Sequence, residues 1–300
     1  MKLSTSTCLH KRKDDSGRPF SPAEVLSAFK RAGYDSVDID FWSLSGPDLP
    51  MWGDDWEKTV EAFGEASAEL QLPVWQTHSD SYLGTQWDDP KFPHHEERRR
   101  SIFRSIEAAS RLGADCVVMH PYNKKMVGEY SSEENRAAAI AFLAPYIEAA
   151  KKAGVRIAIE NLTNFGDGRR RHCGGPIEEL IDLVDTINDP AVGICIDTGH
   201  ANIAGLNVAE ALRASGSRVI ALHINDNYAS LGSDMHQLPF MGDVDWADVM
   251  RAISEIGYRG HFTYEVGGAR RRPDALYQDW LDYTVKVGRG LIAMLDEANG

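Results

Sequence analysis

The sequence predicts an α/β fold, a single-domain (β/α)8 TIM barrel that spans residues 1–300. Three observations point to this class. Short, β-rich apolar runs alternate with longer helical patterns from end to end, and no linker, low-complexity tract or break in composition divides the chain. The third is length, because 300 residues of which 43% are hydrophobic can bury the core of one barrel.

The predicted strands are nearly continuously apolar, as expected of parallel strands that are covered on both faces. In chain order they occupy residues 3–8, 36–41, 74–78, 116–120, 156–160, 192–197, 219–223 and 261–265. Helical patterns predict helices over 21–34, 55–70, 96–113, 132–154, 176–187, 207–216 and 245–257, and a long final helix over 274–298. Several helices run into glycine before the next strand, as at Gly33 and Gly154, which suits a left-handed helix end and a tight turn.

The composition disfavours several classes of protein. A formal net charge of −13 opposes binding to a phosphate backbone, so no nucleic-acid partner is expected. The four cysteines show no paired metal-binding spacing and are expected to be reduced core residues. The N-terminus lacks the apolar stretch of a signal peptide, and no run approaches the roughly 20 apolar residues of a membrane span. We therefore expect a cytoplasmic enzyme with no membrane partner.

Four of the predicted strands end on a side chain that commonly binds metals. These residues are Glu160, Asp197, His223 and Glu265. They are far apart in the sequence, but a barrel brings the C-terminal ends of all its strands to one face. Three carboxylates and one imidazole make a mixed nitrogen and oxygen site, which suits one divalent metal such as Mn²⁺, Mg²⁺, Co²⁺ or Zn²⁺.

More polar residues fall on the same rim. His78 and His120 end two further strands, and six such positions in one barrel argue against chance placement. His200 could orient a substrate, act as an extra ligand, or be a loop histidine that bonds to the backbone. Asp234 and His236 form a D-x-H pair that could be a second metal arm or simply loop polarity and lid contacts.

The pair of glutamates gives the sharper chemical indication. If Glu160 and Glu265 approach one metal from opposite sides, each keeps an oxygen free to exchange a proton with a carbon held between them. The metal would meanwhile polarise a carbonyl and stabilise an enediolate. Trp42 lies near the rim, where an aromatic wall suits the apolar face of a sugar ring, although core packing is an alternative.

Several motifs together resemble the xylose isomerase-like TIM barrel superfamily, often described as sugar phosphate isomerases and epimerases. The motifs are AIENL, CIDTGHANIAG, LHINDN, a D-x-H followed by GDVDW, and YEV, and the resemblance is strongest over residues 158–266. It implies that Glu160, Asp197, His223 and Glu265 bind one divalent metal and that the two glutamates double as acid and base. It also implies that His200 orients the substrate.

The resemblance leads us to expect a divalent-metal-dependent isomerase or epimerase. Its substrate would be a sugar, keto-sugar or polyol, and its reaction a proton transfer through a metal-stabilised enediolate between two glutamates. Its expected substrate-binding residues are His78, His120, His200, Asp234, His236 and Trp42. Relatives in the superfamily are often dimers or tetramers, so a homo-oligomer is possible, and the long loops 43–54 and 225–243 could act as lids or interface arms.

Two alternatives stay open. The same enolate chemistry serves a dehydratase or lyase that acts on an inosose or an oxidised sugar. An apurinic-site endonuclease of the endonuclease-four type uses three zinc ions, and its ligand types also find matches here in His78, His120, Glu160, Asp197, His200, His223, Asp234, His236 and Glu265. The chain also departs from the epimerase pattern, because an arginine expected soon after His223 is absent and Phe240 replaces the first glycine of a P-G-x-G stretch.

Overall fold

The computed structural model describes residues 1–10, 13–81, 89–124, 130–164, 171–267 and 272–298. Eight parallel strands follow in the order β7-β6-β5-β4-β3-β2-β1-β8. They are β1 (Leu3–Ser6), β2 (Ser36–Asp40), β3 (Val74–His78), β4 (Cys116–Met119), β5 (Arg156–Glu160), β6 (Val192–Asp197), β7 (Val219–His223) and β8 (Phe262–Tyr264). The sheet closes through a bridge between Ile224 and Tyr264, and Ile224 N–H donates to the carbonyl oxygen of Thr263 at 2.8 Å. The predicted (β/α)8 barrel is confirmed.

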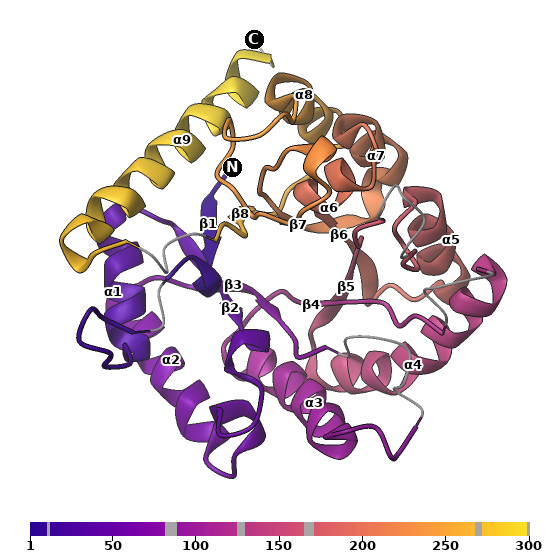
Figure 1. Ribbon diagram of the computed structural model, residues 1–300, viewed down its shortest axis with the longest axis horizontal. Coiled ribbons are helices and arrows are strands. Elements are labelled where there is room, and N and C mark those ends of the chain that lie inside the picture. Colours follow the sequence, from indigo (N-terminus) through magenta and orange to yellow (C-terminus); the bar gives the residue numbers. More distant parts are fainter. Residues whose placement is uncertain (11–12, 82–88, 125–129, 165–170, 268–271, 299–300) are drawn as a thin grey trace.

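Helices cover the outside of this barrel. They are α1 (Pro22–Ala32), α2 (Trp56–Leu70), α3 (His95–Arg111), α4 (Ser132–Ala153), α5 (Ile177–Ile187), α6 (Thr198–Ile203), α7 (Val208–Ser215), α8 (Trp246–Glu255) and α9 (Tyr277–Ala298). Figure 1 looks down the barrel and shows the helices surrounding the strands in chain order, with α9 returning to the side of α1. Along these described ranges, no helix combines the length and apolarity that crossing a bilayer would require.

The helix boundaries follow from local chemistry. Ser21 and Glu24 form a reciprocal capping box at the start of α1, and Gly33 ends that helix with φ 102°. Gly154 ends α4 in the same left-handed region, as its position in the sequence predicts. The final helix begins at Tyr277 rather than at 274, because a 3₁₀ turn over Asp274–Leu276 follows Pro273. The short helix α6 is absent from the sequence prediction, since six residues carry too little periodicity.

The inside of the barrel contains a small apolar cluster of its own. It consists of Cys116, Val118, Ala158, Cys195 and Ala221. Side chains two residues apart on a strand share a face, so Ala158, Cys195 and Ala221 lie on the same interior face as the residues that end β5, β6 and β7. All four cysteines are free, and three of them are buried. On β4 to β7, apolar side chains therefore lie below the polar residues at the strand ends.

Candidate active site

The four predicted metal ligands converge at the C-terminal mouth of the barrel. Glu160, Asp197 and His223 end β5, β6 and β7, and Glu265 follows β8 directly. Each offers one ligand atom, and these four atoms all lie within 4.8 Å of one another. Glu160, Asp197 and His223 are 0% exposed, so a charge held there would be shielded from bulk water.

Three atoms of this group face one another without a hydrogen bond. Glu160 Oε1 and Glu265 Oε2 lie 3.3 and 3.2 Å from Nδ1 of His223. None of the three atoms has a hydrogen-bond partner within the described part of the chain. Buried polar atoms without a partner are costly, and one cation between them would satisfy all three. This donor set of carboxylate oxygens and an imidazole nitrogen fits a single divalent metal.

The fourth residue of the group, Asp197, already accepts hydrogen bonds on both of its oxygens. Asp197 Oδ1 accepts the backbone N–H of His200 at 2.6 Å, and Oδ2 accepts an N–H of the Asn225 side chain at 2.7 Å. Gly199 makes room for that amide, because a Cβ at Gly199 would lie 1.8 Å from Oδ1 of Asn225. The glycine of the DTGH motif is therefore a packing requirement at the site.

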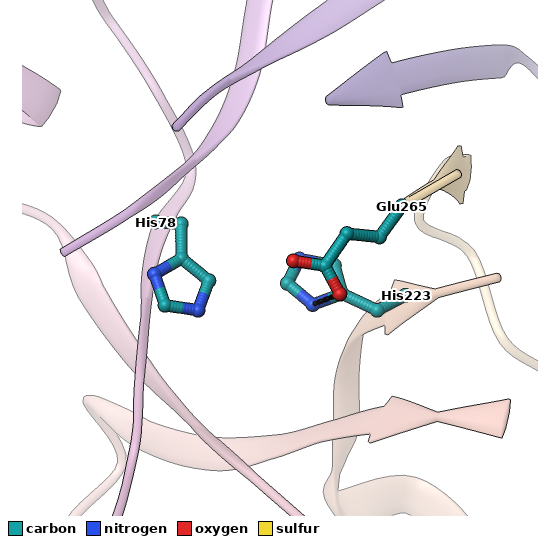
Figure 2. A group of neighbouring side chains, drawn as sticks. All are labelled: His78, His223 and Glu265. Carbon is teal, nitrogen blue, oxygen red and sulfur yellow. Dashed lines mark ion pairs between the residues drawn. The ribbon is translucent and has the colours of Figure 1, made fainter. Parts of the chain in front are cut away.

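Two further histidines approach the other oxygen of Glu160. Nε2 of His78 and Nε2 of His120 each lie 3.2 Å from Glu160 Oε2, and the three residues form a second group of possible ligands. His78 also belongs to a group with His223 and Glu265, and Figure 2 shows its ring facing those two side chains from β3. Glu160 thus lies between the two predicted sets of residues.

Asp234 and His236, in the loop after β7, form a third group with His200 of α6. His200 Nε2 and His236 Nε2 lie 3.1 and 3.0 Å from Asp234 Oδ2, and the three could hold an ion together. This group borders the first one, because His200 Nδ1 is 3.3 Å from Glu160 Oε1 and His236 Nδ1 is 3.5 Å from Glu265 Oε2. All the polar residues that the sequence singles out therefore line one continuous site.

Trp42 forms an open wall beside the histidines. Its ring centroid lies 6.3 Å from the rings of both His78 and His120, and the residue is 40% exposed. By contrast, Trp52 and Trp56 are buried between the helices and loops outside the strands, and Trp52 Nε1 donates to Asp80 at 2.9 Å. Of these three tryptophans, only Trp42 offers a substantial exposed aromatic face at the mouth.

The loop after β7 keeps its shape despite the missing glycine. Phe240 takes the glycine position of the P-G-x-G pattern with φ 71°, in the left-handed region that a bulky residue adopts only under strain. Asp226 holds the loop by accepting the backbone N–H of Phe240 at 3.0 Å and Nε1–H of Trp246 at 2.9 Å. Gly242 remains essential, because a Cβ there would lie 2.3 Å from Oδ1 of Asp226. The side chain of Phe240 is consequently directed to solvent, with 64% of its surface exposed.

Both catalytic candidates are ionised at neutral pH. Burial raises the pKa of the Glu160 carboxyl, but the imidazoles of His223 and His120 outweigh this and hold the pKa well below its usual range. Burial likewise opposes ionisation of Glu265, whose pKa falls to about 2 because His223 and His236 lie beside it. Each carboxylate is therefore available as a metal ligand or a proton acceptor.

For three neighbouring groups the pKa is raised instead. Burial lowers the pKa of the His78 imidazole, yet its contact with Glu160 raises the pKa to about 9. For His236, Glu265 outweighs burial and raises the pKa to about 10. Burial raises the pKa of Asp197 to about 7. The imidazoles of His78 and His236 thus carry protons that balance the carboxylates, whereas burial lowers the pKa of His120. A cation entering the site would displace some of these protons.

The sequence prediction missed the residues that support this site from within. Asp38, in the centre of β2, contacts His223, while Asn225 holds Asp197. A signal for Asp38 exists, because an acidic residue in the middle of the strand SVDID must point into a buried space if the run is a strand. The role of Asn225 could not be inferred, because its partner Asp197 lies at the end of another strand.

The fold and these residues define a class of protein, and comparison with known sequences gives the family. The family model described as xylose isomerase-like TIM barrel matches residues 26–286, so the chain belongs to that family. An uncharacterised protein of Methanocaldococcus jannaschii, MJ1311, is 32% identical over 166 residues, which are 54% of each chain. The L-ribulose 3-epimerase of Methylomonas sp. is 29% identical over 251 residues, covering 81% of this chain and 77% of that enzyme.

Solved structures share the same fold. A D-tagatose 3-epimerase-like protein superposes with a TM-score of 0.76 at 20% identity and covers 100% of both chains. The IOLI protein, solved with a bound zinc atom, gives a TM-score of 0.70 at 16% identity and covers 99% of each chain. Similar proteins thus include sugar epimerases, and the chain resembles an isomerase or epimerase in both sequence and fold.

Proposed function

We propose that this protein is a divalent-metal-dependent isomerase or epimerase of a sugar, keto-sugar or polyol. One observation carries the proposal: two glutamates, Glu160 and Glu265, approach the same nitrogen of His223 with buried oxygens that have no hydrogen-bond partner among the described residues. Such a pair can hold one cation and still present carboxylate oxygens to a substrate from two sides. The similarity to sugar epimerases supports the same class of substrate.

The chemistry would be a proton shift beside a carbonyl. Glu160 or Glu265 would remove the proton from the carbon next to the carbonyl, and the other would return a proton on the opposite face. Glu160, Asp197, His223 and Glu265 would hold the cation, which when bound supplies positive charge for the oxygen of the enediolate. Because the ligand oxygens are buried, the reacting carbon would be sheltered from water.

The rest of the site would orient the substrate. We assign His78, His120 and His200 to contacts with sugar hydroxyls, because each lies beside Glu160 at the mouth of the barrel. We assign Asp234 and His236 to the same task from the opposite side of the mouth, where they lie 3.0 Å apart. In this proposal the exposed ring of Trp42 packs against the apolar face of the sugar.

Proton exchange with solvent tests the mechanism. The wild-type protein, loaded with Mn²⁺ or Co²⁺ and incubated in D₂O with a panel of ketoses and inososes, should place deuterium on the carbon beside the carbonyl. Glu265→Gln should lower the exchange rate by about 100-fold or more, since a general base contributes typically 10²–10⁴-fold. Glu255→Gln is the matched control, because Glu255 is an exposed residue of α8 that pairs with Arg213. Exchange that persists at the parent rate in Glu265→Gln would remove this mechanism.

A second function is favoured by a specific observation. The nine residues that match endonuclease-four ligand types gather into overlapping groups, and three of these together contain all nine: Glu160, Asp197, His223 and Glu265; His78, His120 and Glu160; and His200, Asp234 and His236. Three such groups could hold three zinc ions in an apurinic-site endonuclease. The net charge of −13 opposes that reading, because a protein that binds a phosphate backbone needs a basic surface.

Metal counting separates the two functions. Elemental analysis of the purified protein should find about one metal per chain for the sugar enzyme and about three for the nuclease. Asp234→Asn sharpens the result, since it removes one ligand of the third group only and should leave a count of one unchanged. Binding to an abasic DNA duplex that weakens steeply with salt would support the nuclease.

The expected partners and location are proposals as well. We propose a small-molecule sugar as substrate, no nucleic-acid partner, a cytoplasmic location and a homo-oligomer. Within the described ranges, Trp52 and Trp56 are buried in their own barrel, so the segment around them offers less apolar surface to a second subunit than its composition indicates. Exposed apolar side chains instead gather in the loop after β7, at Tyr228, Leu231 and Met235.

A further inference from the structure

A buried carboxylate contacts the far side of the candidate histidine ligand. Asp38, in the middle of β2, is 0% exposed, and its Oδ2 lies 3.2 Å from Nε2 of His223. The other ring nitrogen of His223, Nδ1, faces Glu160 and Glu265. When a cation displaces the proton from Nδ1, the imidazole keeps one N–H, and because a carboxylate can only accept, the contact with Asp38 places that proton on Nε2. The lone pair of Nδ1 is then directed at the two glutamates.

Neighbouring strands hold Asp38 in this position. Gln76 of β3 donates an N–H to the same Oδ2 at 3.2 Å, and Thr263 of β8 donates its hydroxyl to Oε1 of Gln76 at 3.2 Å. Gln76 and Thr263 are also 0% exposed. The four residues thus form one chain of hydrogen bonds across the barrel interior that ends on His223.

Burying the carboxylate of Asp38 costs free energy, so a purely structural role explains this residue poorly. Its second oxygen, Oδ1, is buried and without a hydrogen-bond partner among the residues that the structure describes. An apolar side chain of similar volume in a barrel interior is commonly at least as stable as a buried charge. The carboxylate is therefore better explained by what it does to His223 than by what it adds to the core.

We propose that Asp38 is a positioning residue for the metal centre. By accepting the Nε2–H of His223 it fixes the tautomer and the ring orientation, so that Nδ1 is presented to the cation shared with Glu160 and Glu265. This inference rests on the metal site of the proposed function. Hydrogen-bonded partners of ligating histidines are known to change metal affinity by about 10- to 100-fold when they are mutated.

Calorimetric titration of chelator-stripped protein with Co²⁺ tests the inference without an activity assay. Asp38→Ala should weaken Co²⁺ binding by about 10- to 100-fold. Asp38→Asn should recover most of that loss, because its amide oxygen can still accept the Nε2–H. Thr77→Val is the matched control, since it removes a buried hydroxyl of β3 that has no hydrogen-bond partner among the described residues. It should bind Co²⁺ as the wild type does.

A spectroscopic measurement reports the tautomer directly. In Zn²⁺-loaded protein labelled with ¹⁵N-histidine, long-range ¹H–¹⁵N correlation should find the proton of His223 on Nε2, with the signal identified by its loss in His223→Gln. A proton on Nδ1, or equal Co²⁺ affinity in Asp38→Ala and wild type, would overturn the role of Asp38 and leave the metal site standing. A wild-type protein that takes up no Co²⁺ would instead remove the proposed function, and this inference with it.

Discussion

Gly199→Ala should damage the metal site through a contact that is invisible in the sequence. A Cβ at this position would lie 1.8 Å from Oδ1 and 2.9 Å from Cγ of Asn225, so the amide has to move. That amide donates to Asp197 Oδ2 at 2.7 Å. Overpacking of this kind costs about 1–3 kcal/mol, and losing a hydrogen bond to a charged acceptor costs about 1.5–3 kcal/mol. Because both effects arise from one displacement, we expect the free energy of unfolding to fall by about 2–4 kcal/mol.

The same displacement should weaken metal binding, since Asp197 loses the donor that orients it. Urea unfolding of chelator-stripped protein measures the first effect, and Co²⁺ titration measures the second, for which we expect a loss of about tenfold or more. Gly290→Ala is the control. Gly290 lies in α9 with nothing within 4 Å of an added Cβ, so alanine there should raise stability by about 0.5–1 kcal/mol. Unchanged stability and Co²⁺ affinity in Gly199→Ala would refute the reasoning.

Two further predictions concern pH and substrate. Burial lowers the pKa of His261 to about 4. As the pH falls, the unfolded chain therefore binds this proton before the folded chain does. The free energy of unfolding should decrease by about 1–3 kcal/mol between pH of about 6.5 and 4. Urea unfolding at pH 7 and pH 5 should show a smaller loss for His261→Gln than for wild type, and equal losses would contradict this assignment. Trp42→Ala should raise KM by about 3- to 10-fold for the sugar that the deuterium-exchange assay identifies, and should change kcat less. This is expected if the exposed ring binds the substrate but takes no part in the reaction. An unchanged KM in steady-state kinetics would count against a stacking role.

Much of the fold could be predicted because its signals are local. Each predicted strand overlaps a strand of the structure, and β3, β5, β6 and β7 have the predicted bounds. Apolar continuity and helical periodicity depend on neighbouring residues, so they are readable without coordinates. The exception is α6, which begins at Thr198 because the side chain of Asp197 caps it, and which ends at Ile203.

The convergence of Glu160, Asp197, His223 and Glu265 could also be predicted, because parallel strands in a barrel end on one face whatever their separation in sequence. Their supporting contacts could not. The spacing of residues does not indicate that the Asn225 side chain would donate to Asp197 in the space left by Gly199. This contact depends on how α6 packs against the turn after β7.

The sequence by itself determined the alternation of strands and helices and the chemical types that end the strands. Only the tertiary structure decided that Asp38 would contact His223 across the barrel interior, and that the groups of possible ligands would adjoin around Glu160. The physical reason is that local periodicity follows from neighbouring side chains, whereas these contacts depend on strand register and on the closure of the barrel between β7 and β8.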